Sequence, residues 1–137
     1  MKGFIPSRRK DSHKGDNGKL LIVGGSIEYC GAPLLSALGA LYSGVDLVYL
    51  FVPECNFEVT RSLYPDFIVR KFLGNYLTAA ANPEIMELAR ECQAMLIGPG
   101  ISDREEGVDA VKQILLNIKL PTVLDAAAMY ALKKIPS

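Results

Sequence analysis

The sequence predicts a three-layer α/β fold in which a parallel sheet carries helices on both faces. Two patterns support this prediction. Short apolar runs, typical of strands buried on both faces, alternate with longer segments whose apolar residues recur at helical spacing. Such alternation is typical of parallel sheets, because the connection between two parallel strands usually contains a helix. The chain has 137 residues, half of them hydrophobic, which is enough for one such domain with its own core.

The first residues, 1–18, are predicted to form a polar and basic arm, because glycine and proline interrupt a charged stretch there. A single α/β domain is expected over residues 19–137, beginning with a strand over 19–23. A helix over 31–44 follows, since Pro33 suits a first helical turn and apolar residues then recur every three or four positions.

The rest of the chain repeats this alternation. Further strands are expected over 45–54, 66–72, 94–98 and 121–125, and further helices over 82–92, over 102–118 and from 126 onward. Asn82 is a predicted N-cap, and Asp103 with Glu106 fits the acidic form of a capping box. Their side chains are therefore expected to bond the backbone at the helix starts.

The charge balance argues against two classes of partner. Fifteen Lys and Arg residues face fifteen Asp and Glu residues, so no net field would attract nucleic acid or an anionic membrane. No apolar run reaches the roughly 18 residues of a membrane span, and the N-terminus lacks the apolar centre of a signal peptide. We therefore expect a cytoplasmic protein that binds neither nucleic acid nor membranes.

The cysteines and the histidine argue against two kinds of site. Cys30, Cys55 and Cys92 are odd in number and widely spaced, which suits neither a zinc knuckle nor a redox pair. We expect them to be small buried residues. His13 is the only histidine, so neither a histidine-rich metal site nor a Ser-His-Asp triad is expected.

A glycine-rich turn follows the first predicted strand. In an open parallel sheet, ligands gather at the carboxyl ends of the strands, and glycine lets them approach the backbone. The segment "GGSIEYCGA" at 24–32 does not fit a P-loop, whose glycines have four residues between them and are followed by Lys. It does not fit the Rossmann pattern either, because Gly24 and Gly25 are adjacent. From the residues alone, it is either a ligand-binding turn or a tight connection.

Two other strand ends carry candidate residues. The segment "IGPG" at 97–100 places a proline between glycines directly after an apolar strand. This arrangement makes a rigid corner with accessible backbone, and we expect a ligand contact there. Asp125 ends the last predicted strand at the same sheet edge. Its carboxylate is either a ligand group or a cap for the following helix.

In order, the segments "HKGDNGKLLIVGGSIEYCGAPLLSALGALYSGVDLVYLFVPE", "AMLIGPG" and "LPTVLDAAAMYAL" resemble the ADP/ATP-dependent NAD(P)H-hydrate dehydratases of the ribokinase-like superfamily. The resemblance extends over residues 13–132. It implies a ribokinase-like fold and a lyase that removes water from hydrated NADH or NADPH. Hydrolysis of ADP or ATP, with Mg²⁺, is implied to drive that reaction in the complete enzyme.

The resemblance also implies where the hydrated cofactor binds. The implied contact residues lie in the turns after the first, fourth and fifth predicted strands: Gly25, Ser26, Gly31, Ala32, Gly98, Gly100 and Asp125. No catalytic residue and no metal ligand is assigned, because the family's catalytic aspartate belongs to a Gly-Thr-Gly-Asp turn that has no counterpart here.

Two departures from the family pattern leave three functions open. The family's Asp-Ala-Asp is Asp125-Ala126-Ala127 here, and the family's C-terminal half has no counterpart, so an incomplete sheet is expected. The chain is then half of a dehydratase, completed by a second chain that supplies the C-terminal half. Alternatively, it is a non-catalytic dinucleotide-binding module, or a structural subunit that assembles as a homo-oligomer.

Overall fold

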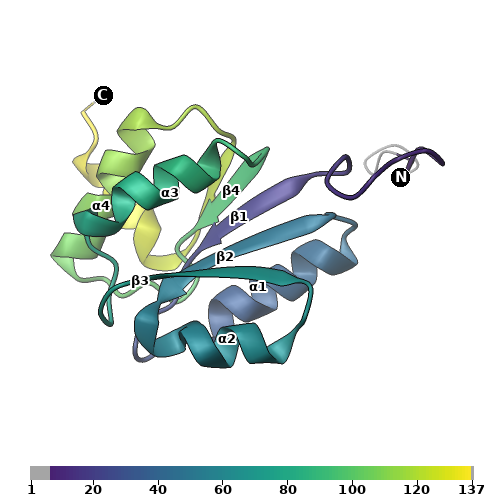
Figure 1. Cartoon of the computed structure of the whole chain (residues 1–137). Coiled ribbons are helices and arrows are strands. Elements are labelled where there is room, and N and C mark those ends of the chain that lie inside the picture. Colours follow the sequence, from purple (N-terminus) through teal and green to yellow (C-terminus); the bar gives the residue numbers. More distant parts are fainter. Residues whose placement is uncertain (1–6, 137) are drawn as a thin grey trace.

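The computed structural model describes residues 7–136 and contains one parallel sheet of five strands (Figure 1). The strands are β1 (Lys19–Val23), β2 (Leu47–Pro53), β3 (Phe67–Phe72), β4 (Ala94–Ile97) and β5 (Thr122–Leu124). Their order across the sheet is β3-β2-β1-β4-β5, so the first strand of the chain lies at the centre. The predicted parallel sheet is confirmed, and all five predicted strands are present.

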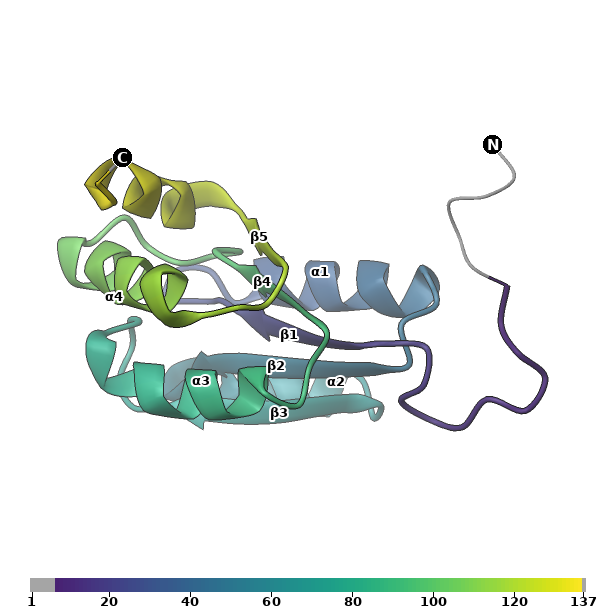
Figure 2. The same ribbon diagram turned by 90° about the horizontal axis from the view of Figure 1, so that it is seen from above.

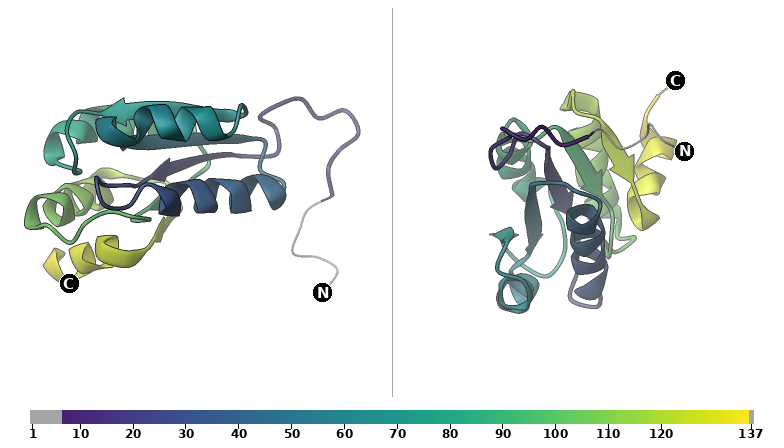
Figure 3. Two further views of the ribbon diagram at one scale, coloured as in Figure 1. Left: turned by 90° about the horizontal axis from the view of Figure 1, so that it is seen from below. Right: turned by 90° about the vertical axis from the view of Figure 1, so that its right-hand side faces the viewer.

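Helices cover both faces of the sheet, as the sequence predicts (Figures 2 and 3). The α-helices are α1 (Gly31–Tyr42), α2 (Phe57–Leu63), α3 (Asn82–Ala89) and α4 (Glu105–Asn117), and the 3₁₀ helices are η1 (Glu54–Asn56), η2 (Ala79–Ala81) and η3 (Ala126–Lys134). Helices α1 and α2 pack on one face, and α3, α4 and η3 pack on the other. No helix within residues 7–136 is long and apolar enough to cross a membrane.

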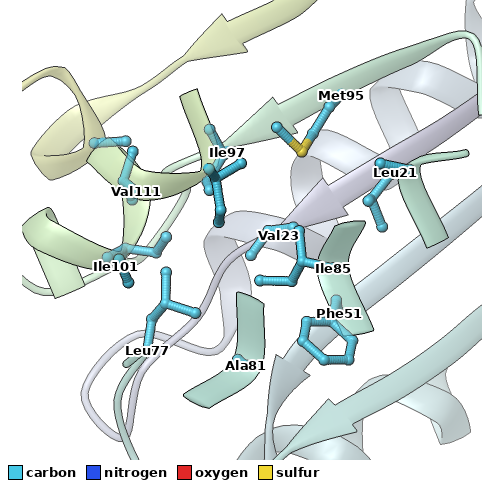
Figure 4. Packing of buried hydrophobic residues seen from close by; sticks show 14 of the residues in the cluster. Leu21, Val23, Phe51, Leu77, Ala81, Ile85, Met95, Ile97, Ile101 and Val111 are labelled. Carbon is cyan, nitrogen blue, oxygen red and sulfur yellow. The ribbon is translucent and has the colours of Figure 1, made fainter. Parts of the chain in front are cut away.

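Each face of the sheet has its own buried cluster, because side chains alternate along every strand. Leu21 and Val23 of β1 join Phe51 and Ile85 in the cluster beneath α3 and α4 (Figure 4). Ile22 joins the cluster beneath α1. All five side chains are fully buried. Strand β1 is therefore apolar on both faces, which explains the continuous apolar run in its sequence.

The predicted capping box of α4 is wrong. The helix begins at Glu105 with Arg104 as its N-cap, one residue later than a box on Asp103 and Glu106 requires, and no side chain caps it. The backbone amide of Arg104 donates instead to the Ser102 hydroxyl at 3.2 Å. This local bond extends the turn that leaves β4 and delays the helix start.

The predicted N-cap of α3 is also wrong. Asn82 is the first residue of the helix, and Ala81 occupies the cap position. The Asn82 side-chain amide donates to the Ala110 carbonyl oxygen at 3.1 Å and to the Gln113 side-chain oxygen at 3.3 Å. The side chain therefore ties α3 to α4, and is not available to cap its own helix.

Two helical segments differ from the expected elements. The segment after residue 126 is the 3₁₀ helix η3 and not the start of an α-helix. It begins at Ala126, whose positive φ of 47° is incompatible with an α-helical start. Helix α2 is absent from the sequence-based prediction, because seven residues are too few to give a clear periodic apolar pattern.

The predicted arm is irregular where it is described, and only one of the three cysteines is buried. Of the predicted arm, residues 7–18 contain turns but no helix or strand, and residues 1–6 lie outside the described part of the chain. The expectation of buried cysteines holds only for Cys92, where burial raises the pKa of the thiol to about 11. Cys30 and Cys55 are exposed, because they lie just before α1 and within η1, outside the packed layers.

Candidate functional site

The turns that follow β1, β4 and β5 meet at the carboxyl edge of the sheet. The backbone amide of Gly25 donates to the Pro99 carbonyl oxygen at 2.8 Å. The Gly98 amide donates to the Val23 carbonyl oxygen at 3.1 Å, and the Asp125 amide donates to that of Ile97 at 3.0 Å. The structure thus brings together three segments that the sequence assigns to one site.

Two of the predicted glycines, Gly98 and Gly100, are required by contacts between these turns, and Gly25 is required by a contact with Asn56 of η1. Gly25, Gly98 and Gly100 have positive φ values of 89°, 129° and 71°, which side-chain-bearing residues rarely adopt. A Cβ on Gly98 would collide with the Asp125 carbonyl oxygen, and one on Gly100 would lie 2.8 Å from the Tyr29 carbonyl oxygen. The turns therefore pack against each other, and the glycines make that packing possible.

Gly31 and Ala32 begin α1 at the same edge. A Cβ on Gly31 would meet open space, in contrast to the three glycines of the turns. Ala32 is half-buried, and its carbonyl oxygen accepts a hydrogen bond from the Ser36 hydroxyl at 3.0 Å. The α1 start is thus the most accessible of the predicted backbone positions.

Ser26 and Asp125 differ sharply in exposure. Ser26 is fully buried, and its hydroxyl has no hydrogen-bond partner among residues 7–136. Asp125 is exposed and occupies the N-cap position of η3, but its carboxylate makes no capping bond. Of the two roles left open for Asp125, the geometry therefore gives no support to the cap, and the carboxylate is free to meet a ligand.

A cleft of about 860 Å³ opens beside these turns. Its walls come from the loops after β1, β3 and β4 and from η3: Glu28, Tyr29, Tyr76, Ile101, Ser102, Asp103, Arg104, Ala126, Ala127, Met129, Tyr130 and Lys133. None of the seven predicted site residues, all within the described chain, is among them. Two of them lie directly beside wall residues in the sequence, since Gly100 precedes Ile101 and Asp125 precedes Ala126. The other five predicted residues are two or three positions from the nearest wall residue, so the cleft and the predicted site adjoin but do not coincide.

A hydrogen-bonded pair fixes one wall of the cleft. The Tyr76 hydroxyl donates to the Glu28 carboxylate at 2.6 Å, which lowers the pKa of Glu28 and raises that of Tyr76. The Arg104 guanidinium lies over the Tyr76 ring, 4.4 Å from its centroid. Sequence reasoning missed all three residues. Arg104 could have been found from the sequence, because it follows the strand over 94–98, whose carboxyl end was already a candidate position.

The polar segment before β1, residues 13–18, lies at the opposite end of the sheet. It wraps around Asp46, whose carboxylate accepts hydrogen bonds from the backbone amides of Gly15 at 2.9 Å and Asn17 at 3.0 Å. The Asn17 side-chain amide donates to the same oxygen at 2.9 Å. The Asp46 side chain is only 5% exposed. This segment therefore anchors the amino ends of β1 and β2, far from the cleft.

Comparisons with known proteins identify the family. A family model described as NAD(P)H-hydrate dehydratase matches residues 20–136. The chain belongs to this family. It is 43% identical over 132 residues to the ADP-dependent (S)-NAD(P)H-hydrate dehydratase of Nitrosopumilus maritimus, covering 94% of this chain and 46% of that relative. It is 42% identical over 129 residues to the bifunctional NAD(P)H-hydrate repair enzyme Nnr of Methanothermobacter thermautotrophicus, covering 91% of this chain and 25% of that relative.

Solved structures share the fold of this chain. The ADP/ATP-dependent NAD(P)H-hydrate dehydratase of Bacillus subtilis, co-crystallized with ATP and Mg²⁺, matches with a TM-score of 0.69 and 28% identity, over 90% of this chain and 42% of that one. A ribokinase-like superfamily protein of Enterococcus faecalis matches with a TM-score of 0.78 and 21% identity, over 95% and 44%. The fold is thus ribokinase-like, and the chain spans less than half the length of these relatives.

Proposed function

We propose that this chain supplies the N-terminal half of a nucleotide-dependent NAD(P)H-hydrate dehydratase, a lyase that repairs hydrated NADH or NADPH in the cytoplasm. The observation that carries the proposal is the meeting of three turns, after β1, β4 and β5, beside an 860 Å³ cleft. The family match over residues 20–136 supports it. ADP or ATP, with Mg²⁺, is proposed as the co-substrate of the complete enzyme.

The predicted turn residues would hold the hydrated dinucleotide through backbone groups and small side chains. The proposed contacts are Gly25, Ser26, Gly31, Ala32, Gly98, Gly100 and Asp125. The exposed Asp125 carboxylate can bond ligand hydroxyls or amides, and the unpartnered Ser26 hydroxyl can do so only if the turn that buries it moves. Tyrosines in the cleft wall offer flat surfaces for the nicotinamide and adenine rings. These groups bind and orient, and the catalytic residue would come from the other half.

The other half would pack against the uncovered part of the sheet. Strand β5 is an edge strand, and Val123 on it is 64% exposed. Val123 points to the face that carries α1, where α1 packs on β1 and β2. Leu35 of α1 is 71% exposed. Parallel sheets are usually covered on both faces, so this region suits a strand and a helix of a second chain, with self-association as the alternative.

A reconstitution assay tests the proposal. Purified chain is mixed with hydrated NADH and ADP or ATP, and the absorbance of reduced nicotinamide is followed. We expect no turnover from this chain alone. Turnover is expected when it is co-expressed with the C-terminal part of the Nitrosopumilus relative, which begins where the match to this chain ends. Nucleotide-dependent turnover by this chain alone would overturn the proposed division of the enzyme.

A non-catalytic dinucleotide-binding module is the second candidate. It is favoured by Ala127, which stands where the family pattern has a second aspartate and lines the cleft. In the reconstitution assay, this alternative predicts a stable complex that binds hydrated NADH but does not convert it. Restoring the carboxylate with Ala127→Asp would then be the direct test of what that position contributes.

A further inference from the structure

Arg104 stands in the cleft wall with its hydrogen-bonding capacity unused. It lies at the end of the turn after β4, one residue before α4. Its side chain forms no ion pair and donates no hydrogen bond to any group of residues 7–136. A guanidinium carries five N–H donors, and here they face a cleft large enough for a nucleotide.

The position of this guanidinium is set by its neighbours. It stacks on Tyr76, whose hydroxyl is held by Glu28 at 2.6 Å. The backbone amide of Ile27 donates to the Asn75 carbonyl oxygen at 3.1 Å, so the Tyr76 segment is also tied to the loop after β1 through the main chain. The guanidinium carbon lies over the ring face, and no hydrogen bond or ion pair within residues 7–136 holds its N–H groups, so two of them can donate in parallel to a phosphate.

The other charged groups of the cleft wall are Glu28, Asp103 and Lys133. The Glu28 carboxylate accepts a hydrogen bond from the Tyr76 hydroxyl. The Lys133 ammonium lies over the Tyr130 ring, 5.5 Å from its centroid. Two cations that lie over tyrosines therefore share one cleft with two carboxylates, of which Glu28 is held by Tyr76 and Asp103 lies next to Arg104 in the sequence. A ligand that combines phosphate with flat rings suits such a wall, because guanidinium binds phosphate in a bidentate manner and rings stack on tyrosine.

We propose that Arg104 is the residue that binds the diphosphate group of the nucleotide ligand in this cleft, and that Tyr76 and Glu28 are positioning residues for it. The inference rests on the proposed function and names the group that recognises the charge of the ligand. A hydrated dinucleotide and ADP both carry a diphosphate, so the experiment uses both, with inorganic pyrophosphate as the minimal probe.

Calorimetric titration of the full chain with pyrophosphate, ADP and hydrated NADH tests the proposal. Arg104→Gln is expected to weaken pyrophosphate binding at least tenfold and to reduce its dependence on salt concentration, which a purely structural defect would not do. Arg104→Lys keeps the charge but loses the planar fork, so intermediate binding is expected. Arg90→Gln is the control: it removes an exposed charge at the C-terminal end of α3, outside the cleft wall, and the variant should bind pyrophosphate like the parent.

The outcomes separate this inference from the proposed function. Equal pyrophosphate binding by the parent and Arg104→Gln, or no binding by the parent, overturns the inference. Pyrophosphate binding without binding of hydrated NADH leaves Arg104 as a diphosphate ligand and counts against the proposed substrate. Tighter binding of ADP than of hydrated NADH, lost in Arg104→Gln, assigns the cleft to the nucleotide co-substrate and retains the inference.

Discussion

The contact between the turns after β4 and β5 predicts a large penalty for Gly98→Ala. A Cβ at this position would collide with the Asp125 carbonyl oxygen and lie 2.9 Å from the Ala128 Cβ. The backbone cannot rotate to avoid the collision at low cost, because the Gly98 amide is bonded to the Val23 carbonyl oxygen. The φ of 129° is also a conformation that almost only glycine adopts.

The expected loss of stability is the sum of two costs. Holding alanine at this backbone conformation costs on the order of 1–3 kcal/mol. Inserting a methyl group into a fully packed position costs a further 1–3 kcal/mol, approximately. We expect the free energy of unfolding to fall by about 2–6 kcal/mol, which lowers the Tm by roughly 10–20 °C for a domain of this size.

Gly39→Ala is the matched control. Gly39 lies inside α1, and a Cβ there would meet nothing within 4 Å. The same substitution should therefore stabilise the chain by about 0.5–1 kcal/mol through the helix propensity of alanine. Urea unfolding followed by circular dichroism measures both variants. A change in the free energy of unfolding below about 1 kcal/mol for Gly98→Ala would refute the packing argument, since the turns would then be free to separate.

Two further predictions concern the candidate site. Ala32→Leu places a larger side chain at the start of α1, and we expect it to abolish binding of hydrated NADH in the chain or the reconstituted complex. The circular dichroism spectrum of Ala32→Leu should match that of the parent, and a substitution of Lys112 should leave binding unchanged. If Ala32→Leu binds hydrated NADH as tightly as the parent, the pocket lies elsewhere. Tyr76→Phe removes the hydrogen bond that lowers the pKa of Glu28, so carboxyl NMR titration should show that pKa rising towards 4.5. The bond stabilises the folded chain at pH values above the pKa of Glu28 in the unfolded state, and this contribution is lost as the pH falls through the lowered pKa of Glu28 in the folded state. If the pKa of Glu28 is unchanged in Tyr76→Phe, the shift has another cause.

Much of the fold was predictable because its strands are buried on both faces. Residues such as Leu21 and Ile22 are adjacent in sequence, point to opposite faces and are both fully buried, so β1 appears as a continuous apolar run. Helix α2 was not predictable in the same way, because its seven residues give no repeated stripe. The cap positions failed for a different reason. Asn82 is held by Ala110 of another helix, and contacts between distant segments override local preference.

The meeting of the turns at one end of the sheet was predictable, and the residues of the cleft wall were not. The turns could be placed at one edge because the carboxyl ends of parallel strands always share an edge. The pairing of Tyr76 with Glu28 joins residues 48 positions apart across two loops, and no local pattern records such a contact. The sequence predicted that the glycines at 98 and 100 let a ligand approach the backbone. The structure shows that neighbouring turns occupy the space beside both glycines, which no local pattern could indicate.

The anchoring of the segment before β1 by Asp46 has a practical consequence for fusion proteins. The carboxylate holds Gly15 and Asn17 at the amino ends of the strands, so the chain enters the sheet at the end opposite the turns after β1 and β4 (Figure 1). An affinity tag, a reporter or a second enzyme joined upstream would therefore connect through this anchor, at the end of the sheet away from the cleft. Surface immobilisation through an N-terminal tag should likewise leave the cleft facing solution, so that binding of the proposed nucleotide ligands can be tested on the immobilised chain.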